Sequence, residues 1–190
     1  MSTNRNDNDD SDCSDRSRLR CRDIMTRDVS VVTRDMTLQD VAVLMREEDT
    51  GIIPVVEVAG TPDLPDDSNE PMMAKSRARK YSHGKLVGLI TDRDIVVRAV
   101  AEGRDAKSIR AEEVMTTEIH SAREDDRVID IIRMMGDKQV RRIPVVSEDG
   151  ILHGIISMAD VVLEIEADHE LAGALEEISS GASFWNRVFG

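Results

Sequence analysis

The stretch Gly88-Leu89-Ile90-Thr91-Asp92-Arg93-Asp94 has a counterpart 66 positions later, Gly154-Ile155-Ile156-Ser157-Met158-Ala159-Asp160. Each opens with a glycine and two large aliphatic residues, which are typical of a buried strand. Each closes with a hydroxyl residue followed three positions later by an aspartate, a spacing typical of the start of a helix. The two stretches therefore predict the same strand-to-helix junction twice.

The repetition extends upstream at a spacing of 90 positions. Ile24-Met25-Thr26 matches Val114-Met115-Thr116, and Ile53-Pro54-Val55-Val56 matches Ile143-Pro144-Val145-Val146. Between these landmarks, apolar residues recur with the period of a helix. Each copy is predicted to fold in the order β-α-β-β-α, which gives an α/β (α+β) protein of two tandem units.

The change of spacing from 90 to 66 indicates a 24-residue insertion in the first copy. This segment is rich in proline and charge, and such a composition predicts a mobile surface loop. The predicted organisation is a disordered polar tail at 1–20, a first unit at 21–104 with the insertion at 59–83, a second unit at 111–168, and a C-terminal helix with an aromatic tail at 169–190.

The composition excludes several classes of protein. A net charge of -13 and an aromatic content of 2% disfavour nucleic-acid binding, which needs cations and stacking partners. No apolar run is long enough to span a bilayer, and the N-terminus lacks a signal-peptide core. We therefore expect a cytoplasmic protein without a membrane partner, whose Cys13 and Cys21 are free thiols.

These motifs together resemble the CBS domain, named after cystathionine β-synthase, and the tandem copies resemble a CBS pair, or Bateman module, of the stand-alone bacterial type. The resemblance covers roughly residues 23–166. It implies two units related by pseudo-two-fold symmetry, with two clefts between them that bind AMP, ADP or ATP, and sometimes S-adenosylmethionine or NAD. It also implies a homodimer.

The strand-to-helix junctions suit such a ligand chemically. A carboxylate, here Asp94 or Asp160, can accept hydrogen bonds from both hydroxyls of a ribose. The hydroxyl of Thr91 or Ser157 can donate to a ribose or phosphate oxygen. The same spacing also forms a capping box that binds nothing, so both interpretations stay open.

The resemblance also places an adenine slot and phosphate ligands. The slot maps onto Val29, Ile53 and Pro54 in the first copy and onto Ile119, His120, Ile143 and Pro144 in the second. Arg93, Arg141 and Arg142 are the candidate phosphate ligands, because a guanidinium can pair with an anion in bidentate fashion. Plain core packing for the slot residues, and ordinary surface roles for the arginines, are the alternatives.

The sequence therefore predicts a regulatory module whose ligand is an adenine nucleotide, with no catalytic residues, no metal and no cofactor of its own. One alternative is a constitutive dimeric scaffold with degenerate clefts. Another is a metal-dependent nucleotide hydrolase that uses Asp92, Asp94 or Asp160. A homodimer is also predicted because Val43, Leu44, Ile129 and Met134 lie off the main apolar stripes of their helices and are expected to leave surface for a partner.

Overall fold

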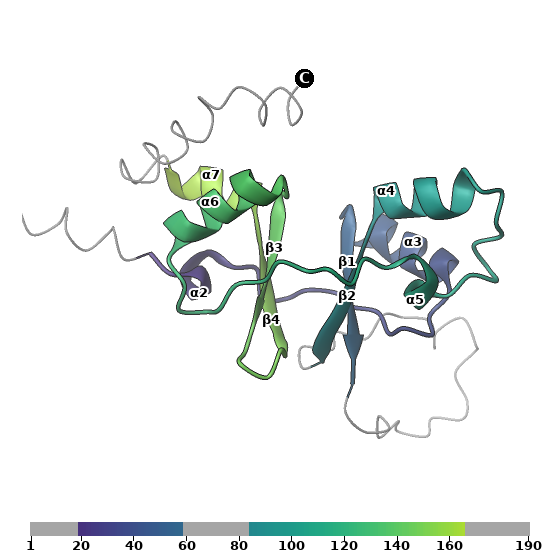
Figure 1. The fold of residues 1–190 in the computed structure, drawn as a ribbon, viewed down its shortest axis with the longest axis horizontal. Coiled ribbons are helices and arrows are strands. Elements are labelled where there is room, and N and C mark those ends of the chain that lie inside the picture. Colours follow the sequence, from purple (N-terminus) through teal and green to yellow (C-terminus); the bar gives the residue numbers. More distant parts are fainter. Residues whose placement is uncertain (1–18, 59–83, 166–190) are drawn as a thin grey trace, which may run out of the picture. The chain divides into compact units, whose positions relative to one another are not determined.

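The computed structural model describes residues 19–58 and 84–165. The predicted polar tail, the insertion at 59–83 and the C-terminal aromatic tail lie outside these residues. In chain order the elements are α2 (Cys21–Ile24), α3 (Leu38–Glu47), β1 (Ile52–Glu57), β2 (Lys85–Thr91), α4 (Asp92–Ile95), the π-helix η1 (Val96–Val100), α5 (Ala111–Val114), α6 (Val128–Lys138), β3 (Arg142–Val146), β4 (Leu152–Ser157) and α7 (Met158–Ile165) (Figure 1).

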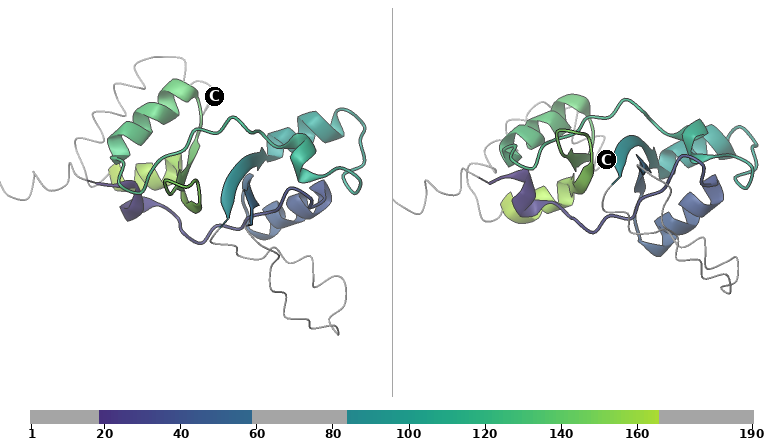
Figure 2. Two further views of the ribbon diagram at one scale, coloured as in Figure 1. Left: turned by 60° about the horizontal axis from the view of Figure 1, so that its bottom comes forward. Right: turned by 90° about the horizontal axis from the view of Figure 1, so that it is seen from below.

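The strands form two small sheets, one from each copy of the repeat. β1 pairs with β2 in antiparallel fashion, with Ile53 opposite Ile90, and β3 pairs with β4. In the first copy α3 and α4 lie against this sheet, and the helices occupy one side of it (Figures 1 and 2). The predicted mixture of helices and strands in two units is confirmed.

The predicted first strand of each copy is reduced to a single parallel bridge. Val32 bridges Val55, and its amide donates to the carbonyl of Pro54 at 3.0 Å. The next bond of a parallel ladder would need an N–H on Pro54, which proline lacks. Pro144 accepts a bond from Ala122 at 2.9 Å in the same way, so the proline in each strand stops the ladder.

Two short helices that the sequence analysis missed connect the copies. α2 begins the first copy, yet it docks on second-copy residues, because the Cys21 amide donates to Asp126 O at 3.0 Å. α5 begins the second copy and docks on the first, since the Ala111 amide donates to Met36 O at 2.8 Å. Each copy therefore receives the opening segment of the other.

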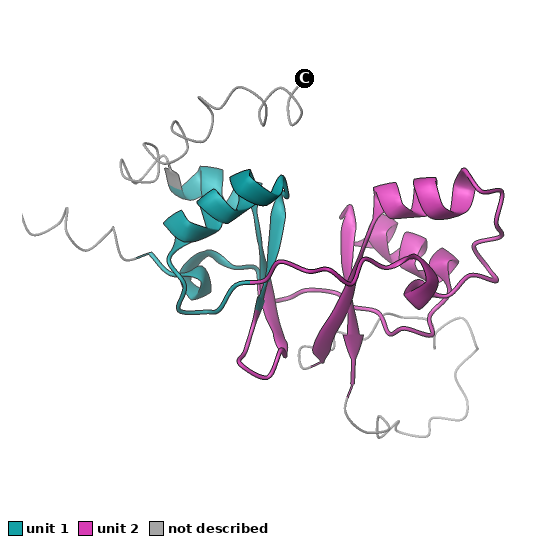
Figure 3. Ribbon diagram, in the orientation of Figure 1, with its two compact units in different colours: residues 1–26, 122–145, 155–190 teal, residues 27–121, 146–154 magenta. Residues whose placement is uncertain are grey.

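The two compact units reflect this exchange (Figure 3). Within the described residues, unit 1 combines 19–26, 122–145 and 155–165, and unit 2 combines 27–58, 84–121 and 146–154. Neither unit is contiguous in sequence. The predicted limits 21–104 and 111–168 remain limits of the sequence repeat, which the compact units cross.

Arginines repeat the exchange at the start of each short helix. Arg20 donates through Nη1 to Asp125 O at 2.9 Å, and Arg110 donates through Nη1 to Asp35 O at 2.6 Å. Arg20 and Arg110 are counterparts in the repeat, as are Asp125 and Asp35. The same contact is therefore made once in each unit.

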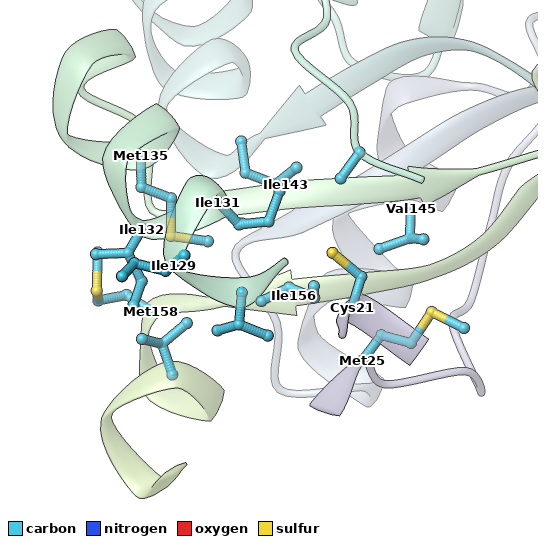
Figure 4. Packing of buried hydrophobic residues seen from close by; sticks show 13 residues of the cluster. Cys21, Met25, Ile129, Ile131, Ile132, Met135, Ile143, Val145, Ile156 and Met158 are labelled. Carbon is cyan, nitrogen blue, oxygen red and sulfur yellow. The ribbon is translucent and has the colours of Figure 1, made fainter. Parts of the chain in front are cut away.

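Each unit has its own apolar core. In unit 1, the exchanged Cys21 and Met25 pack with residues of α6, β3, β4 and α7 (Figure 4). In unit 2, the exchanged Ala111 and Val114 pack with residues of α3, β1 and β2. Cys21, Ala111 and Val114 are all 0% exposed, so the exchanged segments are part of the cores.

A smaller apolar cluster, formed by Val31, Val56, Val146 and Leu152, lies beside an unusual pairing in unit 2. Lys85 forms an antiparallel bridge with Ile151, its own counterpart in the repeat. Leu86 N donates to Gly150 O at 2.9 Å, and Leu152 N donates to Gly84 O at 3.0 Å. Within unit 2, segments that are counterparts in the repeat are thus joined directly by backbone hydrogen bonds.

Helices α3 and α6 bury a wider face than the main stripe of apolar residues in each sequence predicts. Leu44 and Ile129 are 4% and 8% exposed and belong to the cores, while Val43 and Met134 are half-buried. The expectation that these residues leave surface for a partner is therefore wrong for Leu44 and Ile129, while Val43 and Met134 keep part of their surface exposed. Within residues 19–58 and 84–165, the exposed large apolar residues lie on η1 and α7: Val96, Val97, Val100, Val162 and Leu163. Among the described residues, no helix combines the length and apolar character needed to cross a membrane.

Replacing Val114 by alanine should destabilise the protein by about 2 kcal/mol, because the change opens a cavity in a fully buried position of an exchanged segment. Urea unfolding followed by circular dichroism measures the free energy of unfolding. Glu112→Ala on the same short helix is the control, since Glu112 is exposed and its loss should change stability by less than about 0.5 kcal/mol. Equal effects for the two variants would contradict the role assigned to α5.

Cys21 should resist alkylation in the folded protein. Burial, followed by the charge of Asp126, raises the pKa of this free thiol from 9.0 to about 12. Above pH 9 the unfolded thiol ionises while the folded one stays neutral, so its contribution to stability falls as the pH rises from 9 to about 12. Iodoacetamide labelling of a Cys13→Ser chain at pH 8 should be slow without urea and fast with it, and fast labelling without urea would contradict the assignment.

Candidate functional site

The first candidate site, the Asp94 site, lies where β2 passes into α4. Asp94 Oδ2 accepts from the Thr91 amide at 2.8 Å and from the Thr91 hydroxyl at 2.7 Å. Thr91 Oγ1 accepts in return from the Asp94 amide at 3.2 Å. The side chain of Asp94 is 15% exposed. The local fold is therefore a reciprocal capping box that uses one of the two carboxylate oxygens.

The second candidate site, the Asp160 site, repeats this geometry where β4 passes into α7. Asp160 Oδ2 accepts from the Ser157 amide at 2.7 Å and from the Ser157 hydroxyl at 2.6 Å. Ser157 Oγ accepts from the Asp160 amide at 3.2 Å. Both residues are half-buried. The predicted pairing of hydroxyl and carboxylate is thus present in both copies.

A third hydroxyl–aspartate pair with the same spacing occurs at a helix start that is not a candidate site. Thr37 Oγ1 donates to Asp40 Oδ2 at 2.6 Å at the start of α3, and the Asp40 amide donates back to Thr37 Oγ1 at 3.2 Å. Hydroxyl–carboxylate geometry alone therefore marks a helix start rather than a ligand. The Asp94 and Asp160 sites differ from it because each follows a strand directly and also binds the backbone amide of its hydroxyl residue.

A backbone hydrogen bond ties each junction to the chain just before the neighbouring strand. The Asp92 amide donates to Gly51 O at 3.1 Å, and the Met158 amide donates to Arg141 O at 2.8 Å. Gly51 and Arg141 are counterparts. A Cβ on Gly51 would lie 3.1 Å from the Asp92 carboxylate, so the first copy has little space there for a side chain.

The structure divides the predicted slot residues between the two units. Val29, Ile53 and Pro54 lie in unit 2 with the Asp94 site. Ile143 and Pro144 lie in unit 1 with the Asp160 site, whereas Ile119 and His120 lie in unit 2. Ile53 and Ile143 are 1% and 0% exposed and belong to the cores, so packing accounts for their side chains. Val29, Ile119 and His120 are half-buried.

The predicted phosphate ligands are on the surface or close to it. Arg93 and Arg141 are exposed, and Arg142 is half-buried at the start of β3. Arg141 and Arg142 accompany the Asp160 site in unit 1, and Arg93 accompanies the Asp94 site in unit 2. Of these three predicted ligands, two therefore lie in the unit of the Asp160 site and one in the unit of the Asp94 site.

Sequence reasoning missed Arg98, which contacts the Asp94 site directly. Its Nη2 lies 3.4 Å from Asp94 Oδ1 and donates to Thr116 Oγ1 at 3.3 Å. Its Nη1 donates to the carbonyl of Val114 in the exchanged segment. A basic residue four positions after an acid on a helix was the available signal, because such pairs lie on one face.

The described residues give no support to a metal-dependent hydrolase. Residues 19–58 and 84–165 contain no group of three or more histidines, cysteines and acids placed to hold a metal ion. Asp92 is exposed, and its Oδ1 accepts from the Arg93 amide at 2.7 Å. Asp94 and Asp160 are each engaged in a helix cap. The aspartates of that alternative thus have local structural partners.

Comparison with known proteins identifies the class. The family model of the CBS domain matches residues 21–63 and 111–167. CBS domain-containing protein YhcV of Bacillus subtilis is 31% identical over 158 residues, which cover 83% of this chain and 94% of the relative. The chain belongs to the CBS domain family, and its two matched regions make it a CBS domain pair.

More distant comparisons agree on the fold. Hypoxic response protein 1 of Mycobacterium tuberculosis is 30% identical over 159 residues, 84% of this chain and 93% of that protein. A crystal structure of Hypoxic Response Protein I with two coordinated zinc ions, 30% identical, covers 76% of this chain and 97% of its own with a TM-score of 0.57. The CBS domain pair of protein MJ0100, in complex with 5-methylthioadenosine and S-adenosyl-L-methionine, is 21% identical with a TM-score of 0.59 and covers 78% of this chain and 97% of its own.

Proposed function

We propose that this CBS domain pair is a non-catalytic regulatory module that binds an adenosyl compound such as AMP, ADP or ATP. The observation that carries the proposal is the Asp160 site. Its carboxylate is held by Ser157 through Oδ2 alone, and within the described chain Oδ1 of Asp160 has no hydrogen-bond partner. A ribose offers two adjacent hydroxyl donors, which match a half-buried carboxylate with one oxygen still available.

A solved structure of the family and the arginines of this chain support the same class of ligand. The fold holds 5-methylthioadenosine and S-adenosyl-L-methionine in the MJ0100 pair. In this chain, Arg141 and Arg142 lie in the same unit as Asp160 and are the proposed partners of a phosphate or carboxylate on the ligand. Val29 and Pro54, in the unit of the Asp94 site, and Pro144, in the unit of the Asp160 site, remain the proposed surroundings of a base.

The proposed regulation follows from the exchanged segments. A ligand shifts a conformational equilibrium only if it binds one arrangement better than another. Arg98 links the Asp94 site to Val114 and Thr116. A ligand at Asp94 can therefore alter the hydrogen bonds of the segment that opens the second copy. This link supports the proposal of a regulatory module, because it gives the Asp94 site a direct path to the exchanged segment. We also propose a cytoplasmic location.

Asp160→Asn should weaken AMP binding at least about tenfold, because a hydrogen bond to a charged group contributes about 1.5–3 kcal/mol. Asparagine keeps one acceptor oxygen for the cap, so α7 should survive the change. Isothermal titration calorimetry of the full chain measures the affinity. Asp40→Asn is the matched control, since it alters the equivalent cap of α3 and should leave AMP affinity unchanged.

Two outcomes of this experiment would contradict the proposal. Failure of AMP, ADP, ATP and S-adenosylmethionine to bind the unmodified chain would favour the scaffold. An equal loss of affinity in Asp160→Asn and Asp40→Asn would show that Asp160 acts only through helix stability. Turnover of ATP above background would instead restore the hydrolase alternative.

We also propose that two chains associate as a homodimer through η1 and α7. Val97 and Leu163 are counterparts in the repeat and are 50% and 73% exposed, and Val96 and Val162 are a second exposed pair. Both copies thus present an apolar helix face at the same position. Closed two-fold pairing is the commonest way to cover such a surface.

The double variant Val97→Asp with Leu163→Asp should convert a dimer into a monomer, because it places charge at the centre of both apolar faces. Light scattering after size exclusion measures the mass. Gln39→Asp, at an exposed position on α3, adds charge elsewhere and should leave the dimer intact. A single-chain mass for the unmodified protein at micromolar concentration would refute the dimer, and a double variant that keeps the two-chain mass would refute this interface.

A further inference from the structure

The two capping carboxylates differ in their second oxygen. At the Asp94 site both oxygens are engaged, Oδ2 by Thr91 at 2.7 Å and Oδ1 by Arg98 at 3.4 Å. At the Asp160 site Oδ2 is engaged by Ser157 at 2.6 Å, and Oδ1 has no partner in the described parts of the chain. A ribose could therefore approach Asp160 directly but would have to compete with a guanidinium at Asp94.

Arg98 is held in place by acceptors besides Asp94. Nη1 donates to the carbonyl of Val114, and Nη2 donates to Thr116 Oγ1 at 3.3 Å. The side chain is 43% exposed, so the ion pair is partly screened by water. The additional acceptors orient the guanidinium, however, and reduce the entropy lost when it pairs with the carboxylate. Arg98 thus acts as a latch between the helix and the exchanged segment.

The second copy has the surroundings of this latch but not the arginine. The counterpart of Arg98 is Glu164, which cannot pair with a carboxylate. The counterparts of Val114 and Thr116 are Ile24 and Thr26, and Thr26 bridges Ile155 just as Thr116 bridges Leu89. The backbone also differs, because Arg98 lies on the π-helix η1 whereas α7 is α-helical as far as Ile165.

We propose that Arg98 determines the order of ligand binding by closing the Asp94 site, so that an adenosyl ligand binds first at Asp160. This inference rests on the proposed function and adds the inequality of the two sites to it. Neutral ribose hydroxyls cannot replace the charge of the guanidinium at Asp94 Oδ1. A second ligand must therefore displace from Asp94 a guanidinium that Val114 and Thr116 hold in place, which makes the Asp94 site the weaker one.

Reciprocal variants test the latch in the full chain, with AMP as the probe in calorimetry. Arg98→Met removes the guanidinium and keeps most of the apolar stem, and it should tighten the weaker site by about three- to tenfold. Glu164→Arg supplies an arginine beside Asp160 and should weaken the tighter site by a similar factor. Arg104→Met is the control, because Arg104 forms an exposed ion pair with Glu113 and does not contact Asp94.

The outcomes separate the latch from the function on which it rests. Binding at two sites of equal affinity, or unequal binding that Arg98→Met and Glu164→Arg leave unchanged, would overturn the latch and leave the adenosyl function standing. Absence of AMP binding in the unmodified chain and in both variants would overturn the two proposals together. Tightening in Arg104→Met as large as in Arg98→Met would show a general charge effect and would also overturn the latch.

A measurement without ligand examines the latch itself. The guanidinium NMR signals of Arg98 should show hindered rotation in the unmodified chain, since Nη1 and Nη2 bind different acceptors. Asp94→Asn should speed this rotation, because it removes the charge that pairs with Nη2 at 3.4 Å. Free rotation in the unmodified chain would overturn the latch whatever the binding data show.

Discussion

The exchange of opening segments is the constraint on which the rest of the structure depends. Val114 and Cys21 are fully buried in units whose other core residues come from the opposite copy of the repeat. Backbone hydrogen bonds of 2.8–3.0 Å, such as those between Thr116 and Leu89, join each exchanged segment to the second strand of the copy that receives it. That strand leads directly into a capping carboxylate. The exchange therefore positions both candidate sites, and neither unit can form its core from one copy alone.

The same carboxylate serves the fold and the proposed function at each junction. One oxygen of Asp160 is used by the Ser157 amide and hydroxyl, which stabilises the start of α7. This bond also fixes the rotamer of the side chain, so the remaining oxygen is oriented before a ligand arrives. A preorganised acceptor loses less entropy on binding than a mobile one. The cap and the ligand site are therefore complementary uses of one residue.

The sequence repeat predicts most of this fold because apolar period and turn chemistry are local signals. The repeat indicates the strands near Ile53 and Ile143, the helices α3 and α6, and the capping pairs. The exchange is invisible to the same reasoning, since nothing in the four-residue helices α2 and α5 states which copy they join. Burial of Leu44 and Ile129 was missed because helical periodicity marks the main apolar stripe and not the width of the face that the core buries; both residues belong to the cores that also hold the exchanged segments. The spacing of four positions between Asp94 and Arg98 could have predicted their ion pair. The contacts of Arg98 with Val114 and Thr116 could not be predicted in this way, because they depend on the exchange.

Three hydroxyl–aspartate pairs in this chain share one cap geometry, at Thr37, Thr91 and Ser157. A motif that describes only these residues cannot separate them, because the shared geometry uses a single carboxylate oxygen. The surroundings of the other oxygen distinguish the Asp94 and Asp160 sites, and they are set four positions later, by Arg98 in one copy and Glu164 in the other. An arginine there supplies a partner that competes with a ribose, whereas a glutamate repels the carboxylate and leaves its oxygen to a neutral donor. In the binding order proposed for this chain, the difference between the two sites thus depends on a helix residue outside the repeated motif.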